Sequence, residues 1–327
     1  MEPFAEAAAQ YRDFAEHAHG ESPCFEDWAR RVADDDEVLG WLTGLPPVKQ
    51  QPNLVFAAAR WHGVPAPGPY DGLREALLGD DGTIRATIMS RFTQTNEVGR
   101  LATLVPVLGR IQEESGRPLA LIEVGASAGL CLLPDRFDYE WRTASGAVRL
   151  GDGVGPTLTC DVSGDAALPD RLPRVLWRGG LDLNPIDVTD PDATAWLTNL
   201  VWPEQDDRRR LLGEAVNIAR TDPPRLVRGN LLTDLPPLLD EAGSQGQVVV
   251  FHSAVIAYLA PDDRERFHRM MAGFVRHGAC RWVSNEAPGV LPGLIPAGGV
   301  PAGRFVMAVD GRAVAWTHGH GRSMTWL

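Results

Sequence analysis

The sequence predicts an α/β protein in which an N-terminal helical region precedes a mostly parallel β-sheet that ends in an antiparallel hairpin. Three observations predict this class. The first 90 or so residues show helical periodicity and contain no convincing strand. From about residue 118 onward, short apolar runs alternate with helical stretches, which is typical of a parallel sheet covered on both faces. Near the C-terminus, two strand-like runs flank an Asp-Gly turn.

The N-terminal region is predicted to contain several helices. Apolar side chains at Ala7, Tyr11 and Phe14 repeat at the spacing of one buried helix face. Ser22 is followed by a proline, which predicts the N-cap and first turn of a second helix. A third helix is predicted from Asn53 to Trp61. This part of the chain is therefore expected to be built from helices alone.

The remainder of the chain contains the predicted sheet. Five apolar runs are candidate parallel strands: Leu119 to Val124, Val175 to Trp177, Leu226-Val227, Val248 to Phe251 and Arg281 to Val283. A helix that ends at Ile111, with Thr95 or Asn96 as its N-cap, is predicted before the first strand. Further helices are predicted from Asp192 to Arg220 and from Pro261 to His277.

Two additions to this sheet are predicted. The polar, Gly-rich segment at about 135–172 predicts a β insertion after the first strand–helix unit. The terminal hairpin is predicted from Arg304 to Val309 and from Ala313 to Thr317. These boundaries give a helical region at residues 1–90 and a second domain at residues 91–327.

The turn after the first strand, Gly125–Gly129, is the most informative segment. Its small residues allow a backbone to pass close to a ligand and leave N–H groups accessible to it. The dinucleotide fingerprint needs glycine at positions 125, 127 and 130, but the chain has Ser127 and Leu130. The sequence therefore disfavours a nicotinamide dinucleotide.

A hydrolase is a second interpretation of the same turn. The pattern Gly-x-Ser-x-Gly around Ser127 matches a nucleophile elbow, and His318 or His320 would supply the histidine in the order that α/β-hydrolases use. Such an elbow needs strands upstream, where this chain is predicted to be helical. Pro134 would also interrupt the helix that must follow the nucleophile.

The third interpretation is S-adenosylmethionine (SAM) binding through Glu-x-Gly-x-x-x-Gly at residues 123–129. In such sites the carboxylate, here Glu123, helps to anchor the amino end of the cofactor's methionine. Asp182 follows the second strand and would bind two ribose hydroxyls, and Asn230 would meet the adenine edge. These residues follow carboxyl ends of strands, where open α/β sheets bind ligands. The candidate cofactor-binding residues are Asn96, Glu123, Gly125, Ala126, Ser127, Gly129, Asp182, Leu183, Asn230 and Leu231.

With the terminal hairpin, this pattern resembles a Rossmann-like class I methyltransferase fold. The chain also resembles the bacterial domain-of-unknown-function family 2332 over most of its length. The matching segments are Thr93 to Arg100, Glu123 to Leu130, Leu132 to Phe137, Gly180 to Asp187 and Val250 to Ala254. Because that family's name states no activity, the resemblance implies the fold more than the function.

The expected reaction is transfer of the SAM methyl group to a nucleophilic atom of a small molecule. Holding donor and acceptor in line within about 3–3.5 Å can supply much of the acceleration, so a fixed catalytic pair is not required. The candidate catalytic residues are His252, as a general base after the fourth strand, and Glu97. No metal site is predicted. The alternative from another class is a non-catalytic module that binds SAM, a nucleotide or a protein partner.

Charge and composition restrict the partners. The 31 basic and 43 acidic side chains give a net charge of −12, which disfavours binding to nucleic acid or anionic lipid. Lys49 is the only lysine and fits no phosphate-loop, kinase or Schiff-base pattern. The chain has no signal-peptide pattern and no apolar run of about 18 residues. We therefore expect a cytoplasmic protein with a small-molecule substrate, and a homo-oligomer remains open.

Overall fold

The computed structural model describes residues 5–94, 96–165, 167–294, 301 and 303–327. The chain divides into two compact units. The helical unit comprises Met1–Thr95 and Asp190–Arg210, and the sheet unit comprises Asn96–Thr189 and Leu211–Leu327. The helical unit thus takes in residues 190–210, which the predicted domain boundaries assign to the second domain. The predicted cap at Thr95 lies outside the described residues.

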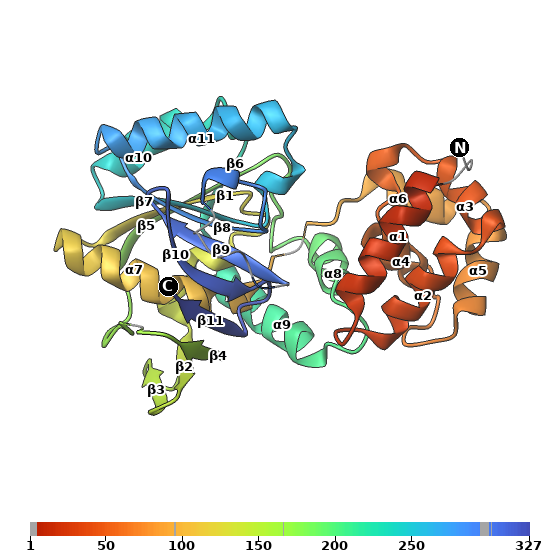
Figure 1. Ribbon diagram of the computed structural model, residues 1–327, viewed down its shortest axis with the longest axis horizontal. Coiled ribbons are helices and arrows are strands. Elements are labelled where there is room, and N and C mark those ends of the chain that lie inside the picture. Colours follow the sequence, from red (N-terminus) through yellow and green to blue (C-terminus); the bar gives the residue numbers. More distant parts are fainter. Residues whose placement is uncertain (1–4, 95, 166, 295–300, 302) are drawn as a thin grey trace. The chain divides into compact units, whose positions relative to one another are not determined.

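The helical unit consists of helices α1 to α6 together with α8 (Figure 1). Their bounds are α1 Ala5–Ala18, α2 Pro23–Ala33, α3 Asp36–Thr43, α4 Pro52–Trp61, α5 Tyr70–Leu78, α6 Thr83–Ser90 and α8 Pro191–Asn199. The predicted N-cap is confirmed, because the Ser22 side chain accepts a hydrogen bond from Phe25 N. Aromatic side chains from three segments meet in the core, among them Phe25, Phe56 and Trp202.

Lys49 has a structural role in this unit. Its ammonium donates to Arg91 O at 2.6 Å and lies 3.9 Å from the centroid of the Phe92 ring. Burial lowers the pKa of Lys49. The single lysine therefore joins the segment after α6 to the short 3₁₀ helix Pro47–Lys49.

The sheet unit contains one sheet of eleven strands among the described residues, in the order β3-β2-β4-β11-β10-β9-β8-β7-β1-β5-β6. The strands are β1 Leu119–Val124, β2 Asp138–Thr143, β3 Gly146–Leu150, β4 Thr157–Ser163, β5 Val175–Asp182, β6 Arg225–Arg228, β7 Gln247–Ser253, β8 Arg281–Glu286, β9 Arg304–Val309, β10 Arg312–His318 and β11 Ser323–Trp326. The fold is thus a mixed α/β fold with a largely parallel central sheet. All five predicted parallel strands and the predicted hairpin are present.

The parallel part of the sheet reverses its strand order at β1. The first strand lies between the second, β5, and the fourth, β7, and it runs parallel to both. In open α/β sheets, such a reversal opens a crevice at the carboxyl ends of the two central strands. The β1–β7 boundary is therefore the expected ligand position in this fold.

Helices cover both faces of the central strands (Figure 1). Helices α10 (Leu235–Gly243) and α11 (Pro261–Arg276) lie along one face, where Ile122 and Val250 contribute to a buried apolar core. Helix α7 (Leu101–Ser115) lies along the other. No helix in the described part of the chain is long and apolar enough to cross a membrane.

Two details of the predicted elements are corrected. The stretch predicted as one helix from Asp192 to Arg220 contains α8 and a separate α9 (Asp206–Thr221). Trp202-Pro203 lies in the break, where a proline removes a backbone donor. The insertion forms β2, β3 and β4 as predicted, but β11, which the sequence did not predict, pairs with both β10 and β4 and so joins the insertion to the main sheet.

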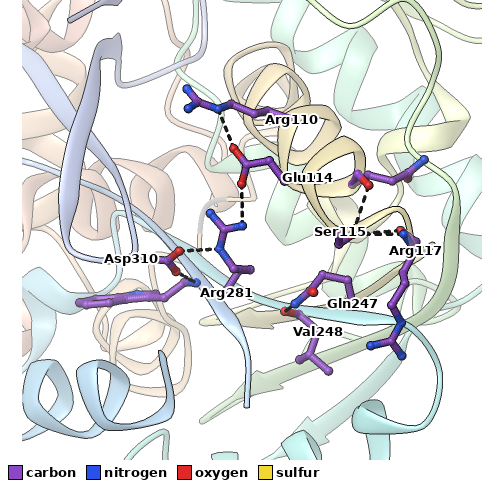
Figure 2. Close-up of polar contacts among 10 residues, drawn as sticks. Arg110, Glu114, Ser115, Arg117, Gln247, Val248, Arg281 and Asp310 are labelled. Atoms are coloured by element: carbon purple, nitrogen blue, oxygen red, sulfur yellow. Dashed lines mark hydrogen bonds and ion pairs between the residues drawn. The ribbon is translucent and has the colours of Figure 1, made fainter. Parts of the chain in front are cut away.

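An ionic network secures α7 at the edge of the sheet where β8 begins (Figure 2). The Glu114 carboxylate accepts hydrogen bonds from Arg110 and Arg281 at 2.9 and 2.8 Å. Arg281 also binds Asp310 in the β9–β10 turn. Hydrogen bonding to Arg281 lowers the pKa of Glu114. This network lies at the amino end of β8, opposite the edge that carries the candidate site.

Candidate functional site

Six strands of the sheet end at one edge. Strands β1, β5, β6, β7 and β8 are mutually parallel, and two antiparallel pairings through β9 return β10 to the same direction. The carboxyl ends of all six, and the turns that follow them, therefore lie at a common edge. Every candidate site residue predicted from the sequence, except Asn96 and Glu97, belongs to one of these strand ends or turns.

The glycine turn after β1 has the conformations that its small residues allow. Gly125, Ser127 and Gly129 have φ values of +71°, +51° and +70°. The N–H groups of Gly125 and Ala126 both donate to Leu181 O on the neighbouring β5. The turn is therefore folded back over the end of β5.

Protein side chains occupy the space beside these glycines. A Cβ atom at Gly125 would lie 2.4 Å from a methyl group of Val255, which follows β7. A Cβ atom at Gly129 would lie 2.7 Å from Pro224. Close packing alone thus requires glycine at both positions, whether or not a ligand also needs them.

Asp182, the last residue of β5, supports the turn. Its carboxylate accepts a hydrogen bond from Ser127 N at 2.8 Å and another from Asn184 N at 2.7 Å. The next residue, Leu183, is 70% exposed, which is unusual for a leucine beside an acidic side chain. Asp182 therefore shapes the glycine turn from the position at which the sequence places a ribose ligand.

Glu123 is a buried carboxylic acid at the end of β1. Its side chain is only 5% exposed, and Oε2 has no hydrogen-bond partner among the described residues. Burial raises the pKa of Glu123 well above its usual range, and the nearby Arg100 guanidinium opposes that shift. An unpaired buried carboxylate is costly, which makes Glu123 a candidate ligand contact.

Arg100 is a candidate site residue that the sequence analysis missed. Its Nε donates to Gly319 O at 2.8 Å, and its Nη1 donates to Ser253 O at 2.9 Å. It thus joins the end of β7 to the turn after β10 and brings a positive charge near Glu123. The segment Thr93 to Arg100 was recognised as a motif, but only the tertiary structure brings its arginine to this edge.

Asn96 and Glu97 lie beside the glycine turn, and the prediction that Asn96 caps a helix is wrong. Glu97 is the N-cap of the 3₁₀ helix Val98–Arg100 and accepts a hydrogen bond from Gly99 N, and α7 follows directly. Asn96 Oδ1 instead accepts a hydrogen bond from Leu130 N at 2.9 Å. The second carboxylate oxygen of Glu97 is 3.0 Å from Nδ1 of His320.

His252 is fully buried inside the protein. Its Nδ1 lies 2.7 Å from Glu286 Oε1, and its Nε2 accepts a hydrogen bond from Trp282 Nε1 at 3.1 Å. The ring also packs edge-on against Phe267 of α11. With no exposed surface and both nitrogens bonded within the protein, His252 in this arrangement does not have the contact with solvent or substrate that a general base needs.

The loop after β7 depends on Glu286, whose Oε1 also accepts hydrogen bonds from Val255 N and Ile256 N. These contacts hold Val255 against Gly125. Tyr258, at the end of the short 3₁₀ helix Ile256–Tyr258, is 73% exposed. Glu286 therefore positions the segment that lines one side of the glycine turn.

Asn230 and Leu231 follow β6 at the same edge. Asn230 is exposed, and its N–H donates to Asp234 while its Oδ1 accepts from Leu232 N. Leu231 is partly buried against the apolar core beneath α10 and α11. These contacts give the loop a defined conformation.

Two comparisons with known proteins bear on the identity of the chain. A family model described as "Uncharacterized protein conserved in bacteria (DUF2332)" matches residues 8–326. No curated protein matches the sequence. The chain is thus similar to a bacterial group whose description names no activity.

Proposed function

This chain belongs to the bacterial family DUF2332, and because that family's description states no activity, we propose the function from the site: SAM-dependent methyl transfer to a small molecule, on a Rossmann-like class I methyltransferase core. The order of the parallel strands supports this proposal. In chain order they lie third, second, first, fourth, fifth across the sheet. This is the order of the doubly wound folds that bind nucleotides at the strand-order reversal.

The unpaired carboxylate of Glu123 carries the proposal. It lies at the end of β1 with one buried oxygen that no described residue satisfies, and Arg100 is near enough to oppose the rise of its pKa. An ammonium group and a carboxylate on one ligand carbon would complement this acid and this guanidinium. The methionine end of SAM carries both groups.

The ends of β5 and β6 suit the adenosine part of the same ligand. Asp182 Oδ2 and Oδ1 accept hydrogen bonds from Ser127 N and Asn184 N, and a carboxylate at this strand end is the kind of acceptor that ribose hydroxyls bind. The exposed side chain of Leu183 offers an apolar surface to the adenine ring, and Asn230 and Leu231 lie at the neighbouring strand end. SAM, when bound, would supply a methyl carbon activated by a positive sulfonium.

Calorimetry with SAM and S-adenosylhomocysteine (SAH) tests the proposal. We expect both to bind, and we expect Glu123→Gln to weaken binding about tenfold or more by removing a charge-assisted hydrogen bond. Glu114→Gln, which changes a carboxylate at the amino end of β8 (Figure 2), is the matched control and leaves the affinity unchanged. If neither molecule binds below about millimolar concentration, the proposal is wrong.

Asp182→Ala provides an independent prediction for the ribose position. We expect the free energy of SAM binding to weaken by about 1–3 kcal/mol, because charge-assisted hydrogen bonds to the hydroxyls are lost. Asp182→Asn keeps one carbonyl acceptor and is expected to lose less. An unchanged affinity in both variants would place the ribose elsewhere.

The esterase alternative through Ser127 has less support. Among the described residues, β1 is the first strand of the chain, so no earlier strand builds the sheet and oxyanion loop of an α/β-hydrolase. The turn continues into the 3₁₀ helices Leu130–Leu132 and Pro134–Arg136 rather than an α-helix. Labelling of Ser127 by a fluorophosphonate, lost in Ser127→Ala, would revive this alternative. A non-catalytic SAM-binding module remains the outcome if SAM binds but no acceptor is methylated.

A further inference from the structure

Ser253, the last residue of β7, ends a chain of three hydrogen-bonded side chains. Thr317 of β10 donates to Asn285 Oδ1 at 2.6 Å, and Asn285 Nδ2 donates to Ser253 Oγ at 3.0 Å. Thr317 and Asn285 are fully buried, whereas Ser253 is partly exposed. The chain of side chains therefore runs from the interior of the sheet to its carboxyl edge.

The two distances indicate the orientation of the Asn285 amide. Hydrogen bonds between two oxygen atoms are shorter than those that an N–H donates, so the 2.6 Å contact suits Oδ1 and the 3.0 Å contact suits Nδ2. Ser253 Oγ is then the acceptor in its contact with Asn285. A serine hydroxyl carries one proton, and the Ser253 proton has no acceptor among the described residues. This strand end thus presents a hydrogen-bond donor.

The strand pairing brings this donor to the acid and the glycine turn. Phe251 pairs with Glu123 across β7 and β1. Side chains two residues apart on a strand share a face, so Ser253 and Glu123 lie on the same face of neighbouring strands. Val255, two residues after Ser253, packs against Gly125. Ser253 therefore lies between the partner of Glu123 and the residue that contacts the glycine turn.

Arg100 provides a second donor beside Ser253. Its Nη1 donates to Ser253 O at 2.9 Å, and its Nη2 donates to no described residue. The next residue, Ala254, has a φ of +57°, which is uncommon for a residue with a Cβ, and its N–H donates to Asn285 O at 3.1 Å. The backbone that carries the Ser253 hydroxyl is thus held from both sides, next to a guanidinium.

We propose that Ser253 and Arg100 together bind the carboxylate at the methionine end of SAM, and that Ser253 makes the site selective for ligands that carry this carboxylate. The inference rests on the proposed SAM site and adds Ser253 to it. A carboxylate accepts several hydrogen bonds and is complementary in charge to a guanidinium. The ammonium group on the same carbon would then face Glu123. Asn285 and Thr317 are positioning residues, because they leave the Ser253 proton for the ligand.

Calorimetry with SAM and decarboxylated SAM tests the inference. Both ligands carry the adenosine, sulfonium and ammonium groups, and they differ only by the carboxylate. We expect the wild type to bind SAM about tenfold more tightly or better, because hydrogen bonds to a charged group are lost with the carboxylate. Ser253→Ala should weaken SAM binding about fivefold or more and leave the affinity for decarboxylated SAM within about twofold of the wild type.

Three further variants separate this role from a structural one. Ser253→Thr retains the hydroxyl and should keep most of the preference for SAM. Thr317→Val removes the donor to Asn285 Oδ1 and should reduce the preference without removing a ligand contact. Ser115→Ala removes another partly exposed serine hydroxyl, at the end of α7 (Figure 2), and is the matched control that leaves both affinities unchanged. A partly unfolded variant would bind less of both ligands, so the ratio of the two affinities reports on the site itself.

Each outcome decides the inference. Equal affinities of the wild type for SAM and decarboxylated SAM would overturn it and leave the proposed function standing, and this measurement needs no variant that might unfold. An equal effect of Ser253→Ala on both ligands, or no effect on either, would remove Ser253 from the carboxylate contact. Failure of both SAM and SAH to bind would instead overturn the proposed function and this assignment together.

Discussion

At Glu123, folding stability and the proposed ligand binding have opposite requirements. Burial makes its charged form unfavourable, and no described residue compensates Oε2. A group whose pKa is raised in the folded state binds more protons there than in the unfolded state. Folding stability is therefore lost as the pH rises from the ordinary value of a glutamate, about 4.3, toward the raised value.

This gives a prediction for Glu123→Gln. The amide does not ionise, so the variant should lack that loss and gain stability relative to the wild type between pH 5 and pH 8. Urea denaturation at several pH values measures the difference. Parallel stability curves for the two proteins would mean that Glu123 is not desolvated as the structure indicates.

Gly125 permits a prediction that separates conformational strain from crowding. Gly125→Ala places a Cβ 2.4 Å from Val255 at a φ of +71°. Gly116→Ala introduces a similar strain at a φ of +64°, but no described atom lies within 4 Å of its Cβ. We expect a loss of about 1–2 kcal/mol for Gly116→Ala and about 1–3 kcal/mol more for Gly125→Ala.

Val255→Ala completes that comparison. Combined with Gly125→Ala, it should recover most of the additional loss, because the crowding methyl groups are removed. Denaturation midpoints measure all four variants. Equal losses at the two glycines would show that Val255 moves aside without cost.

At the scale of elements, the β7–α11 connection depends on buried polar groups. Glu286 accepts hydrogen bonds from His252, Val255 and Ile256. These contacts give His252 bonded partners at the end of the apolar β7 strand, where its side chain has no exposed surface. The buried His252 side chain therefore supports the loop after β7. Its position at the end of a strand in the sequence does not by itself indicate a catalytic role.

His252→Phe tests that conclusion. Removing the ring nitrogens leaves the buried Glu286 carboxylate and the Trp282 N–H without that partner, so we expect a loss of about 2–4 kcal/mol in stability. The affinity for SAM, measured below the unfolding transition, should not change. A stable variant that loses SAM binding would instead place His252 in the site.

At the scale of the whole molecule, the helical unit is discontinuous in sequence. Helix α8 contributes Trp196 to its core, Trp196 Nε1 donates to Phe92 O, and Asn199 Nδ2 donates to Ala57 O. A cut near residue 90 would therefore separate α8 from the helices that cover it.

We predict that a chain of residues 96–327 aggregates, because the apolar face of α8 is exposed. Replacement of residues 190–210 in that chain by a flexible glycine–serine linker should restore a discrete species in size-exclusion chromatography. Aggregation of both chains to the same extent would show that the sheet unit depends on the helical unit for another reason.

The sequence by itself determined the elements of this protein. Apolar runs such as Leu119 to Val124 and turn residues such as Asp310-Gly311 depend on local preferences, so their positions could be read from the chain. The same holds for the strand-end position of Asp182 and Glu123. The sequence analysis missed β11 because this four-residue strand has no apolar run. Its extended conformation depends on pairing with β10 and β4.

Only the tertiary structure decided which side chains meet. His252 lies at the end of β7 and His320 follows β10, so both lie at one edge of the sheet. His252 has no exposed surface, whereas His320 contacts Glu97, which lies 223 residues away in the sequence. Arg100 likewise reaches Ser253 and Gly319 across long separations. Local preference fixes where a residue lies along its strand or turn, whereas burial and partner choice depend on the packing of distant segments, which periodicity does not encode.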